Sequence, residues 1–326
     1  MPQILRGRVS GTKAMQFPEP SWIQRTSLEL ELEDLEVYLR VRSPRGFVGR
    51  RMPAKVDLYS SSYSNYETDI YRQISVETYG RDLGQTSWVS AEESEEIPRA
   101  LELTADSSVL EIGCGSGRYA LHIAEKVGCR VVGLDINEAG ICAASHLVAA
   151  RKMGDQVSFQ YCDASEGLPF ADESFNAIFS NDVFCHIPQR LDVLRESFRV
   201  MKPGGRILFS DALVIGAAIS DQEIATRSSI GHYIFCPPGE NERLVQEAGF
   251  RLLEARDTTT NAAQIAKRRY DARNKRNEAL IAAETKDNFE GVQQFLACVH
   301  ALASERRLLR YLYLAQKPSD SEPSSG

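Results

Sequence analysis

The chain has 326 residues, of which 43% are hydrophobic and 25% are charged, with a formal net charge of −7 and a pI near 5.5. This composition is typical of a globular protein with one large domain or two small ones. The acidic balance argues against a nucleic-acid binder, which usually carries a basic surplus. No apolar run is long enough to cross a bilayer, and no signal-peptide core follows Met1. We therefore expect a cytoplasmic protein that binds neither nucleic acid nor membrane.

The seven cysteines show no Cys-x-x-Cys spacing, their number is odd, and most of them lie in apolar segments. This pattern favours free thiols in a reducing compartment over disulfides or a zinc site. We expect no bound metal.

Residues 1–55 are predicted to form an irregular N-terminal extension. Arg6 and Arg8 precede the first acidic residue, Glu19, which is a faint organelle-targeting pattern, and a disordered leader is the favoured interpretation. Leucine and glutamate alternate within residues 28–41, which indicates a strand or hairpin, although a helical stripe also fits.

A tyrosine-rich segment follows at residues 59–84, and helical spacing is possible at residues 65–78. Two interpretations remain open for these rings. They pack against the core as one face of a helix, or they lie over a bound cation through cation–π contact.

From residue 108 onward, short apolar runs alternate with helical periodicity, which predicts a parallel sheet covered on both faces. The expected strands are residues 109–112, 130–134, 157–161, 177–180, 206–210, 251–255 and 308–315. The expected helices of the sheet domain are residues 118–126, 138–152, 191–201 and 241–248.

Two long helical segments, residues 262–284 and 289–304, precede the last strand. We expect them to form a helical hairpin, inserted over residues 260–305, that caps the carboxyl edge of the sheet. The whole domain is then residues 56–316, with its core at residues 87–256, and residues 317–326 form a disordered tail.

A strand, a glycine turn and a helix surround Gly113, Gly115 and Gly117, and Glu111 stands just before them. Glycines let the backbone approach a ligand, and the following helix directs N–H groups at it. A nicotinamide dehydrogenase would place its third glycine at position 118, which is Arg118 here. A turn that needs glycine for tightness alone is the structural alternative.

Two acids follow at strand ends. Asp135 can accept hydrogen bonds from ribose hydroxyls, and in the alternative it caps the next helix. Asp163 can accept from an adenine amine while the N–H of Ala164 reads a ring nitrogen, or the pair is an ordinary strand-end turn.

Residues 181–188 run off a strand into a loop and contain Asp182 and His186. We interpret both as catalytic residues, with His186 as the general base because its ordinary pKa of about 6.5 suits proton transfer. The alternative is a loop histidine bonded to backbone, and His232 is a second candidate for the base. Residues 202–205 are predicted to stop a helix and turn into a strand.

In order and spacing, this set of motifs resembles the class I S-adenosylmethionine-dependent methyltransferases. The motifs that carry the resemblance are residues 110–117, Asp135, Asp163 with Ala164, and residues 202–205. The resemblance implies a doubly wound, Rossmann-like α/β sheet of seven mostly parallel strands, with the last strand antiparallel. It also implies that S-adenosyl-L-methionine is the cofactor, with its methionine part at the glycine turn, its ribose at Asp135 and its adenine amine at Asp163.

The loop at residues 182–188 and the segment at residues 79–84 are similar to the small-molecule N-methyltransferases that act on glycine, sarcosine, dimethylglycine or phosphoethanolamine. We expect methyl transfer to a small molecule, most simply to an amine nitrogen of an amino acid or related metabolite. O- or C-methylation of a small natural product and a nicotinamide-dependent oxidoreductase are the alternatives. The residues assigned to the cofactor are Glu111, Gly113, Gly115, Gly117, Asp135, Ile136, Asp163, Ala164, Asn181, Tyr79 and Trp88.

Overall fold

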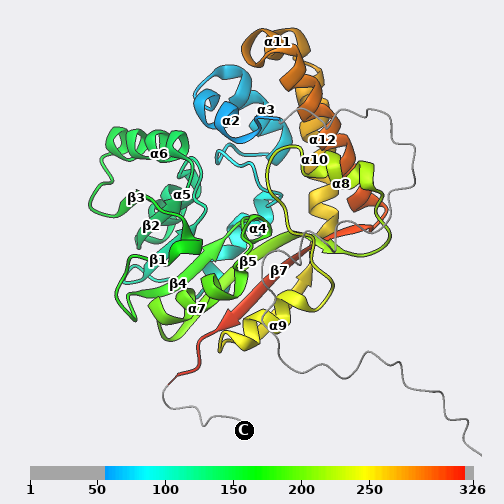
Figure 1. Cartoon of the computed structure of the whole chain (residues 1–326). Coiled ribbons are helices and arrows are strands. Elements are labelled where there is room, and N and C mark those ends of the chain that lie inside the picture. Colours follow the sequence, from blue (N-terminus) through cyan, green and yellow to red (C-terminus); the bar gives the residue numbers. More distant parts are fainter. Residues whose placement is uncertain (1–55, 320–326) are drawn as a thin grey trace, which may run out of the picture. The chain divides into compact units, whose positions relative to one another are not determined.

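The computed structural model describes residues 56–319 and builds them around one seven-stranded sheet (Figure 1). The strand order is β3-β2-β1-β4-β5-β7-β6, and β7 runs antiparallel to both of its neighbours. The strands are β1 (Ser108–Ile112), β2 (Arg130–Asp135), β3 (Val157–Tyr161), β4 (Phe175–Ser180), β5 (Met201–Ile215), β6 (Arg251–Asp257) and β7 (Leu308–Gln316). This arrangement confirms the predicted fold class.

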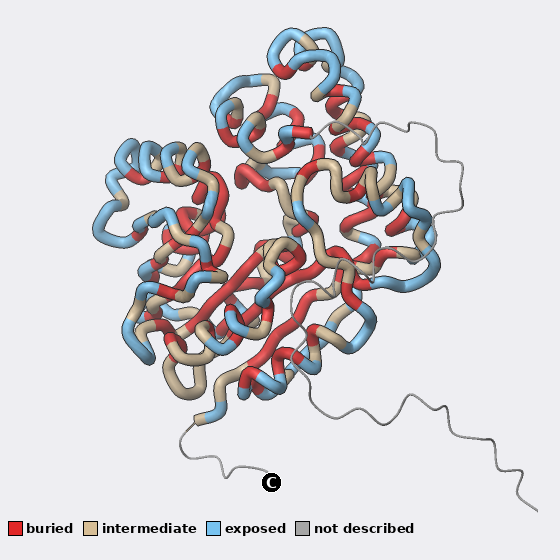
Figure 2. Tube along the Cα trace, viewed as in Figure 1, coloured by how far each residue is buried: buried red, intermediate tan, exposed pale blue. Residues whose placement is uncertain are grey.

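Alternating side chains of the central strands build two separate cores, one on each face of the sheet. In β1, Leu110 joins the core under α7 (Arg190–Val200) and α9 (Glu240–Glu247), whereas Val109 joins the core under α4 (Ala91–Ala100) and α5 (Arg118–Val127). Successive residues of a strand point to opposite faces, so a strand covered on both faces is apolar along its whole length. Figure 2 shows the resulting run of buried residues along the central strands.

Helices α2 (Tyr59–Asn65) and α3 (Asp69–Tyr79) precede the sheet, and α6 (Glu138–Arg151) follows β2. The predicted helical hairpin is in fact three helices, α10 (Thr259–Asn274), α11 (Asn277–Glu284) and α12 (Lys286–Ser304). The apolar faces of α10 and α12 form a core with Trp88 and Leu58, whereas Leu280 of α11 packs with the tyrosines of α2 and α3. In Figure 1, α10, α11 and α12 lie beside α2 and α3.

Two helices that the periodicity did not predict have a sequence signature at their first residue. In α4, Ser90 and Glu93 form a capping box, and in α8 (Asp221–Arg227) Ser220 and Glu223 form another. A serine followed three residues later by glutamate is such a signal, because each side chain accepts from the backbone N–H of the other residue.

The predicted turn at residues 202–205 is an irregularity inside β5. The pairing of β4 with β5 shifts between Phe175 and Ala177, and Gly204 there has a φ of 78°. The predicted helix stop is confirmed, since α7 ends at Val200 and β5 begins at Met201, and the predicted turn is a local bulge within β5. The predicted strand or hairpin at residues 28–41 lies outside the described residues, as does most of the predicted tail.

All seven cysteines are described, and all are free thiols. None of the helices in residues 56–319 combines the length and apolar character that a bilayer crossing requires.

Candidate functional site

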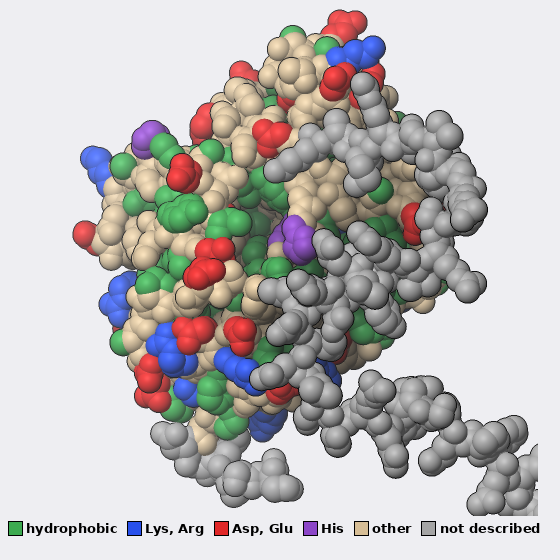
Figure 3. Space-filling model, viewed as in Figure 1, with side chains coloured by type: hydrophobic (Ala, Val, Ile, Leu, Met, Phe, Trp, Pro, Cys, Tyr) green, Lys and Arg blue, Asp and Glu red, His purple; other side chains and the backbone are tan. Residues whose placement is uncertain are grey.

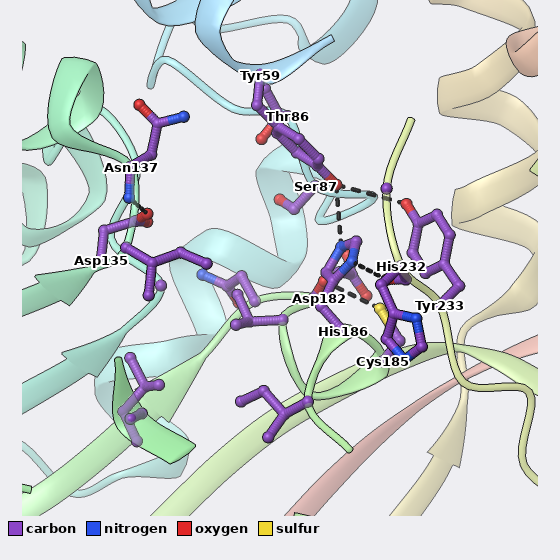
Figure 4. A pocket seen from close by; sticks show the side chains of 18 of the residues that line it. Tyr59, Thr86, Ser87, Asp135, Asn137, Asp182, Cys185, His186, His232 and Tyr233 are labelled. Carbon is purple, nitrogen blue, oxygen red and sulfur yellow. Dashed lines mark hydrogen bonds between the residues drawn. The ribbon is translucent and has the colours of Figure 1, made fainter. Parts of the chain in front are cut away.

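A cavity of about 390 Å³ lies at the carboxyl ends of strands β1, β2, β3 and β4 (Figure 4). The chain passes it at Gly113 after β1, at Asp135 at the end of β2, at Asp163 after β3 and at Asn181 after β4. Open α/β sheets bind ligands at this edge. Hydrophobic side chains surround the hollow in the face shown in Figure 3.

The glycine turn needs glycine at all three positions. Gly113, Gly115 and Gly117 have φ values of 78°, 52° and 72°, in the left-handed region. A Cβ at Gly113 would lie 2.2 Å from Cγ2 of Val183, and one at Gly117 would lie 2.3 Å from Cζ of Phe159. Gly113 borders the cavity, whereas Gly115 and Gly117 belong to the turn but do not border the cavity.

Replacing Gly113 by alanine is expected to lower the free energy of unfolding by about 3 kcal/mol, because the new methyl group meets Val183 and the backbone is left-handed. Urea unfolding measures the change. Gly154→Ala is the matched control, since nothing lies within 4 Å of its Cβ position, and a change of less than about 0.5 kcal/mol is expected there. Equal effects at both positions would contradict the close contact with Val183.

Asp135 is held by backbone N–H groups at one end of the cavity. Its Oδ2 accepts from the N–H of Gly115 at 2.7 Å, and its Oδ1 accepts from the N–H of Asn137 at 2.8 Å. Burial raises the pKa of Asp135, and these N–H groups oppose the rise. The neighbouring Ile136 keeps 62% of its surface exposed and borders the cavity, so it offers an apolar surface beside the carboxylate.

Asp163 and Ala164 also border the cavity. The Oδ1 of Asp163 accepts from the N–H of Ser165 at 2.9 Å and from its hydroxyl at 2.6 Å, so this carboxylate caps the short helix that follows. The second carboxylate oxygen is engaged in neither bond. The structural interpretation of this motif and the ligand-binding one are therefore compatible.

Glu111 lies away from the cavity lining, under the glycine turn. It is buried, and its Oε2 has no hydrogen-bond partner within residues 56–319. Burial, together with the charge of Asp135, raises its pKa well above the ordinary value. A protonated carboxyl group behind the turn is what this environment favours.

Three rings from distant parts of the chain meet at the other end of the cavity (Figure 4). The Tyr59 hydroxyl lies 3.0 Å from Nε2 of His186 and 3.4 Å from the Tyr233 hydroxyl. Nδ1 of His186 lies 2.8 Å from the carbonyl oxygen of His232. A carbonyl accepts, so Nδ1 carries the proton, and Nε2 is left to accept from Tyr59.

Both groups of this pair are uncharged near neutral pH. Burial lowers the pKa of His186 to about 4, and the positive charge of Arg227 acts in the same direction. Burial raises the pKa of Tyr59 well above its ordinary value. The arrangement can take a proton from a ligand through the Tyr59 hydroxyl onto Nε2 of His186.

Asp182 borders the cavity, but its carboxylate is committed to structure. It accepts from the N–H of Trp88 at 2.7 Å, from the Ser210 hydroxyl at 2.9 Å and from Nε of Arg310 at 2.8 Å. Arg310 also donates to Glu93 at 2.8 Å. This geometry favours a positioning role for Asp182 over the catalytic role expected from the sequence.

The remaining predicted residues divide into two groups. Trp88 and Asn181 border the cavity, whereas Tyr79 does not and donates its hydroxyl to the carbonyl of Ser87 at 3.0 Å. The tyrosine-rich segment divides in the same way, because Tyr59 and Tyr63 line the cavity while its other rings pack in the core. The core-packing interpretation is therefore confirmed for the other rings, and the cation–π interpretation stays a prediction for Tyr59 and Tyr63.

Sequence reasoning gave no role to Arg227, which also borders the cavity. It ends α8, a helix whose capping box was the available signal. Nothing in the local pattern indicated that this arginine would be buried.

Comparisons with known proteins bear on what this cavity binds. Residues 110–209 match the family described as "Methyltransferase domain". Over 174 residues the chain is 34% identical to "Methyltransferase GfsG" of Streptomyces halstedii, covering 51% of this chain and 60% of that one. It is 32% identical to "O-methyltransferase resE" of Aspergillus sclerotiorum, covering 53% and 65%. The matched region thus spans less than two thirds of either relative.

A solved structure shares the fold. Phosphoethanolamine N-methyltransferase 2 of Haemonchus contortus, in complex with S-adenosyl-L-methionine, superposes with a TM-score of 0.66 at 20% identity, over 85% of this chain and 62% of that one.

Proposed function

We propose that this chain is a class I S-adenosylmethionine-dependent methyltransferase that transfers the methyl group of S-adenosylmethionine to a small-molecule acceptor, as its match to the methyltransferase domain and to its methyltransferase relatives supports. The observation that carries the proposal is the single cavity that joins the Asp135 end to the Tyr59–His186 end. One end has groups that suit a nucleoside, and the other has groups that suit proton transfer.

The residues of the first end fit the cofactor. Asp135 can accept from ribose hydroxyls, Ile136 can cover one face of the adenine ring, and Asp163 can accept from the adenine amine. The backbone at Gly113 can approach the methionine part because no Cβ stands there. The bound cofactor supplies an electrophilic methyl group on a sulfonium with a good leaving group.

Holding the acceptor in line with that methyl group, away from water, supplies much of the rate acceleration, up to about 7–11 kcal/mol in well-oriented systems. Tyr59 and His186 add a path for the proton that an N–H or O–H acceptor must lose. This favours a nitrogen or oxygen acceptor over a carbon acceptor.

The first candidate acceptor is an amine nitrogen of an amino acid or related metabolite. The rings of Tyr59, Tyr63, Tyr233 and Trp88 border the cavity and suit the ammonium that N-methylation forms. The second candidate is a hydroxyl oxygen, which the similarity to an O-methyltransferase of Aspergillus sclerotiorum favours. Both need the same proton path.

Calorimetry on the full chain tests the proposal. We expect both S-adenosylmethionine and S-adenosylhomocysteine to bind, and the absence of binding by either would overturn it. Transfer of a labelled methyl group to a panel of amines, amino acids and phenols then identifies the acceptor atom.

Replacing Asp135 by alanine is expected to weaken S-adenosylmethionine binding by about 3 kcal/mol, roughly 100-fold, because ribose hydroxyls lose a charged acceptor. Calorimetry measures the dissociation constant. The exposed Asp155 gives the matched control, Asp155→Ala, for which no change is expected. An unchanged dissociation constant in Asp135→Ala would place the ribose elsewhere.

A further inference from the structure

Within residues 56–319, Arg227 is a buried cation without a carboxylate partner. Five arginines in residues 56–319 are buried. Arg190 pairs with Asp211, Arg273 pairs with Glu284, and Arg310 pairs with Glu93 and Asp182. Arg227 is 1% exposed, makes no ion pair with any described residue, and its Nη1 has no hydrogen-bond partner there.

Aromatic rings surround the guanidinium instead. Its Cζ lies 4.6 Å from the ring centroid of Tyr233, 4.9 Å from that of Phe295 and 5.8 Å from that of Trp88. Ring faces attract a cation, but they accept no full charge and no strong hydrogen bond. A buried charge with an unpaired Nη1 remains costly, so an anion at this position would be strongly favoured.

No acid within residues 56–319 is paired with Arg227 to supply that anion. Asp182 is the nearest acid among the cavity-lining groups at this end, and its carboxylate is already shared by Trp88, Ser210 and Arg310. Asp135 lies on the opposite side of the cavity (Figure 4), and Asp163 follows β3, the neighbour of β2, so both belong to the group of residues that suits the cofactor. No acid of the described chain is then left for Arg227, which makes a ligand the source of the counter-charge.

The position of Arg227 is at the acceptor end. The Tyr233 ring contacts both Arg227 and His186, with the His186 and Tyr233 ring centroids 4.3 Å apart. An anion bound at Nη1 of Arg227 would therefore be separated from the Tyr59–His186 pair by the Tyr233 ring alone. That places the anionic group on the acceptor rather than on the cofactor.

The charge of the lining indicates the kind of anion. Arg227 is the one lysine or arginine among the described residues that border the cavity. One fixed positive charge matches a singly charged carboxylate, whereas a phosphate monoester near neutral pH carries close to two negative charges.

We propose that Arg227 is the receptor for a carboxylate group of the methyl acceptor. The proposal rests on the proposed function, since it assumes that the cavity holds an acceptor beside the cofactor. It restricts the acceptor to amino acids and other carboxylic acids of a size that the cavity admits.

The test compares acids with their uncharged amides on the protein loaded with S-adenosylhomocysteine. Two pairs cover both acceptor atoms, sarcosine with sarcosinamide and 4-hydroxybenzoate with 4-hydroxybenzamide, and calorimetry measures each dissociation constant. In at least one pair we expect the acid to bind about 10- to 100-fold more tightly than the amide. Equal binding of acid and amide in both pairs would overturn the proposal.

Variants of Arg227 test whether this residue causes the preference for the acid over the amide. Arg227→Met is expected to abolish the difference between acid and amide, whereas Arg227→Lys is expected to keep part of it. Arg269→Met is the matched control, because Arg269 is also buried without an ion pair in the described chain but does not border the cavity. An acid preference that survives in Arg227→Met would overturn the proposal. If the methionine variant does not fold, an acid preference in Arg227→Lys equal to that of the unaltered protein would overturn it instead.

Two further measurements separate the sources of the anion. The affinity for S-adenosylmethionine should change less than about 2-fold in Arg227→Lys, and a loss equal to that for the acid would assign Arg227 to the cofactor carboxylate instead. Phosphoethanolamine should bind less tightly than sarcosine, and the reverse order would overturn the carboxylate assignment. Failure of S-adenosylmethionine to bind the unaltered protein is a distinct outcome, which overturns the proposed function itself.

Discussion

Replacing His186 by alanine is expected to lower kcat for methyl transfer by about 100- to 10,000-fold and to leave the affinity for S-adenosylmethionine unchanged. The imidazole contacts the Tyr59 hydroxyl at the acceptor end and makes no contact with Asp135. Steady-state kinetics and calorimetry measure the two quantities. His146→Ala, at an exposed position on α6, is the matched control and should retain full activity.

The pH profile gives a second measurement on the same group. Neutral imidazole can accept a proton, and burial lowers the pKa of His186 to about 4. Activity should therefore stay on its plateau as pH falls through the ordinary histidine range, and the His186 limb should appear near pH 4. A limb near pH 6.5 that His186→Ala removes would contradict the buried, neutral state.

His232 could act through its backbone carbonyl or, as a second candidate base, through its imidazole. The structure uses its backbone carbonyl, which accepts from Nδ1 of His186, and a side-chain substitution leaves that carbonyl in place. A loss of kcat in His232→Ala as large as in His186→Ala would make the His232 imidazole the base.

Replacing Arg310 by methionine is expected to lower the free energy of unfolding by about 3–5 kcal/mol, because Glu93 and Asp182 would be left as buried carboxylates without their cation. Urea unfolding measures the loss. Arg306→Met is the matched control, since Arg306 is exposed and pairs with Asp257 at the surface, where a loss below about 1 kcal/mol is expected.

A second substitution tests the cause of that loss. Adding Asp182→Asn to Arg310→Met removes one of the two uncompensated charges, so part of the stability should return. If the double variant is less stable than Arg310→Met by the full effect of a second independent substitution, the ion pair is not the cause.

Local patterns identified most of the sheet and half of the site. The apolar runs located the strands, because each central strand is buried on both faces and must be apolar throughout. The glycine turn, Asp135 and Asp163 were identifiable because each depends on a strand end and its next few residues. The sequence did not predict that the first helix of the insertion ends at Asn274 and a second begins at Asn277. No proline or glycine marks that break.

The sequence by itself determined the fold class, the strand ends that border the cavity and the position of the loop at residues 181–188, because these are properties of short contiguous segments. The tertiary structure decided which groups face one another across the cavity. Tyr59 meets His186 across 127 positions of chain, and Arg310 meets Asp182 across 128. It also decided that Asp182 is a partner of Arg310 and that Arg227 is buried without a carboxylate partner among the described residues. Charge and burial at such positions depend on where separate segments of the chain meet, and local periodicity in the sequence does not predict which segments meet.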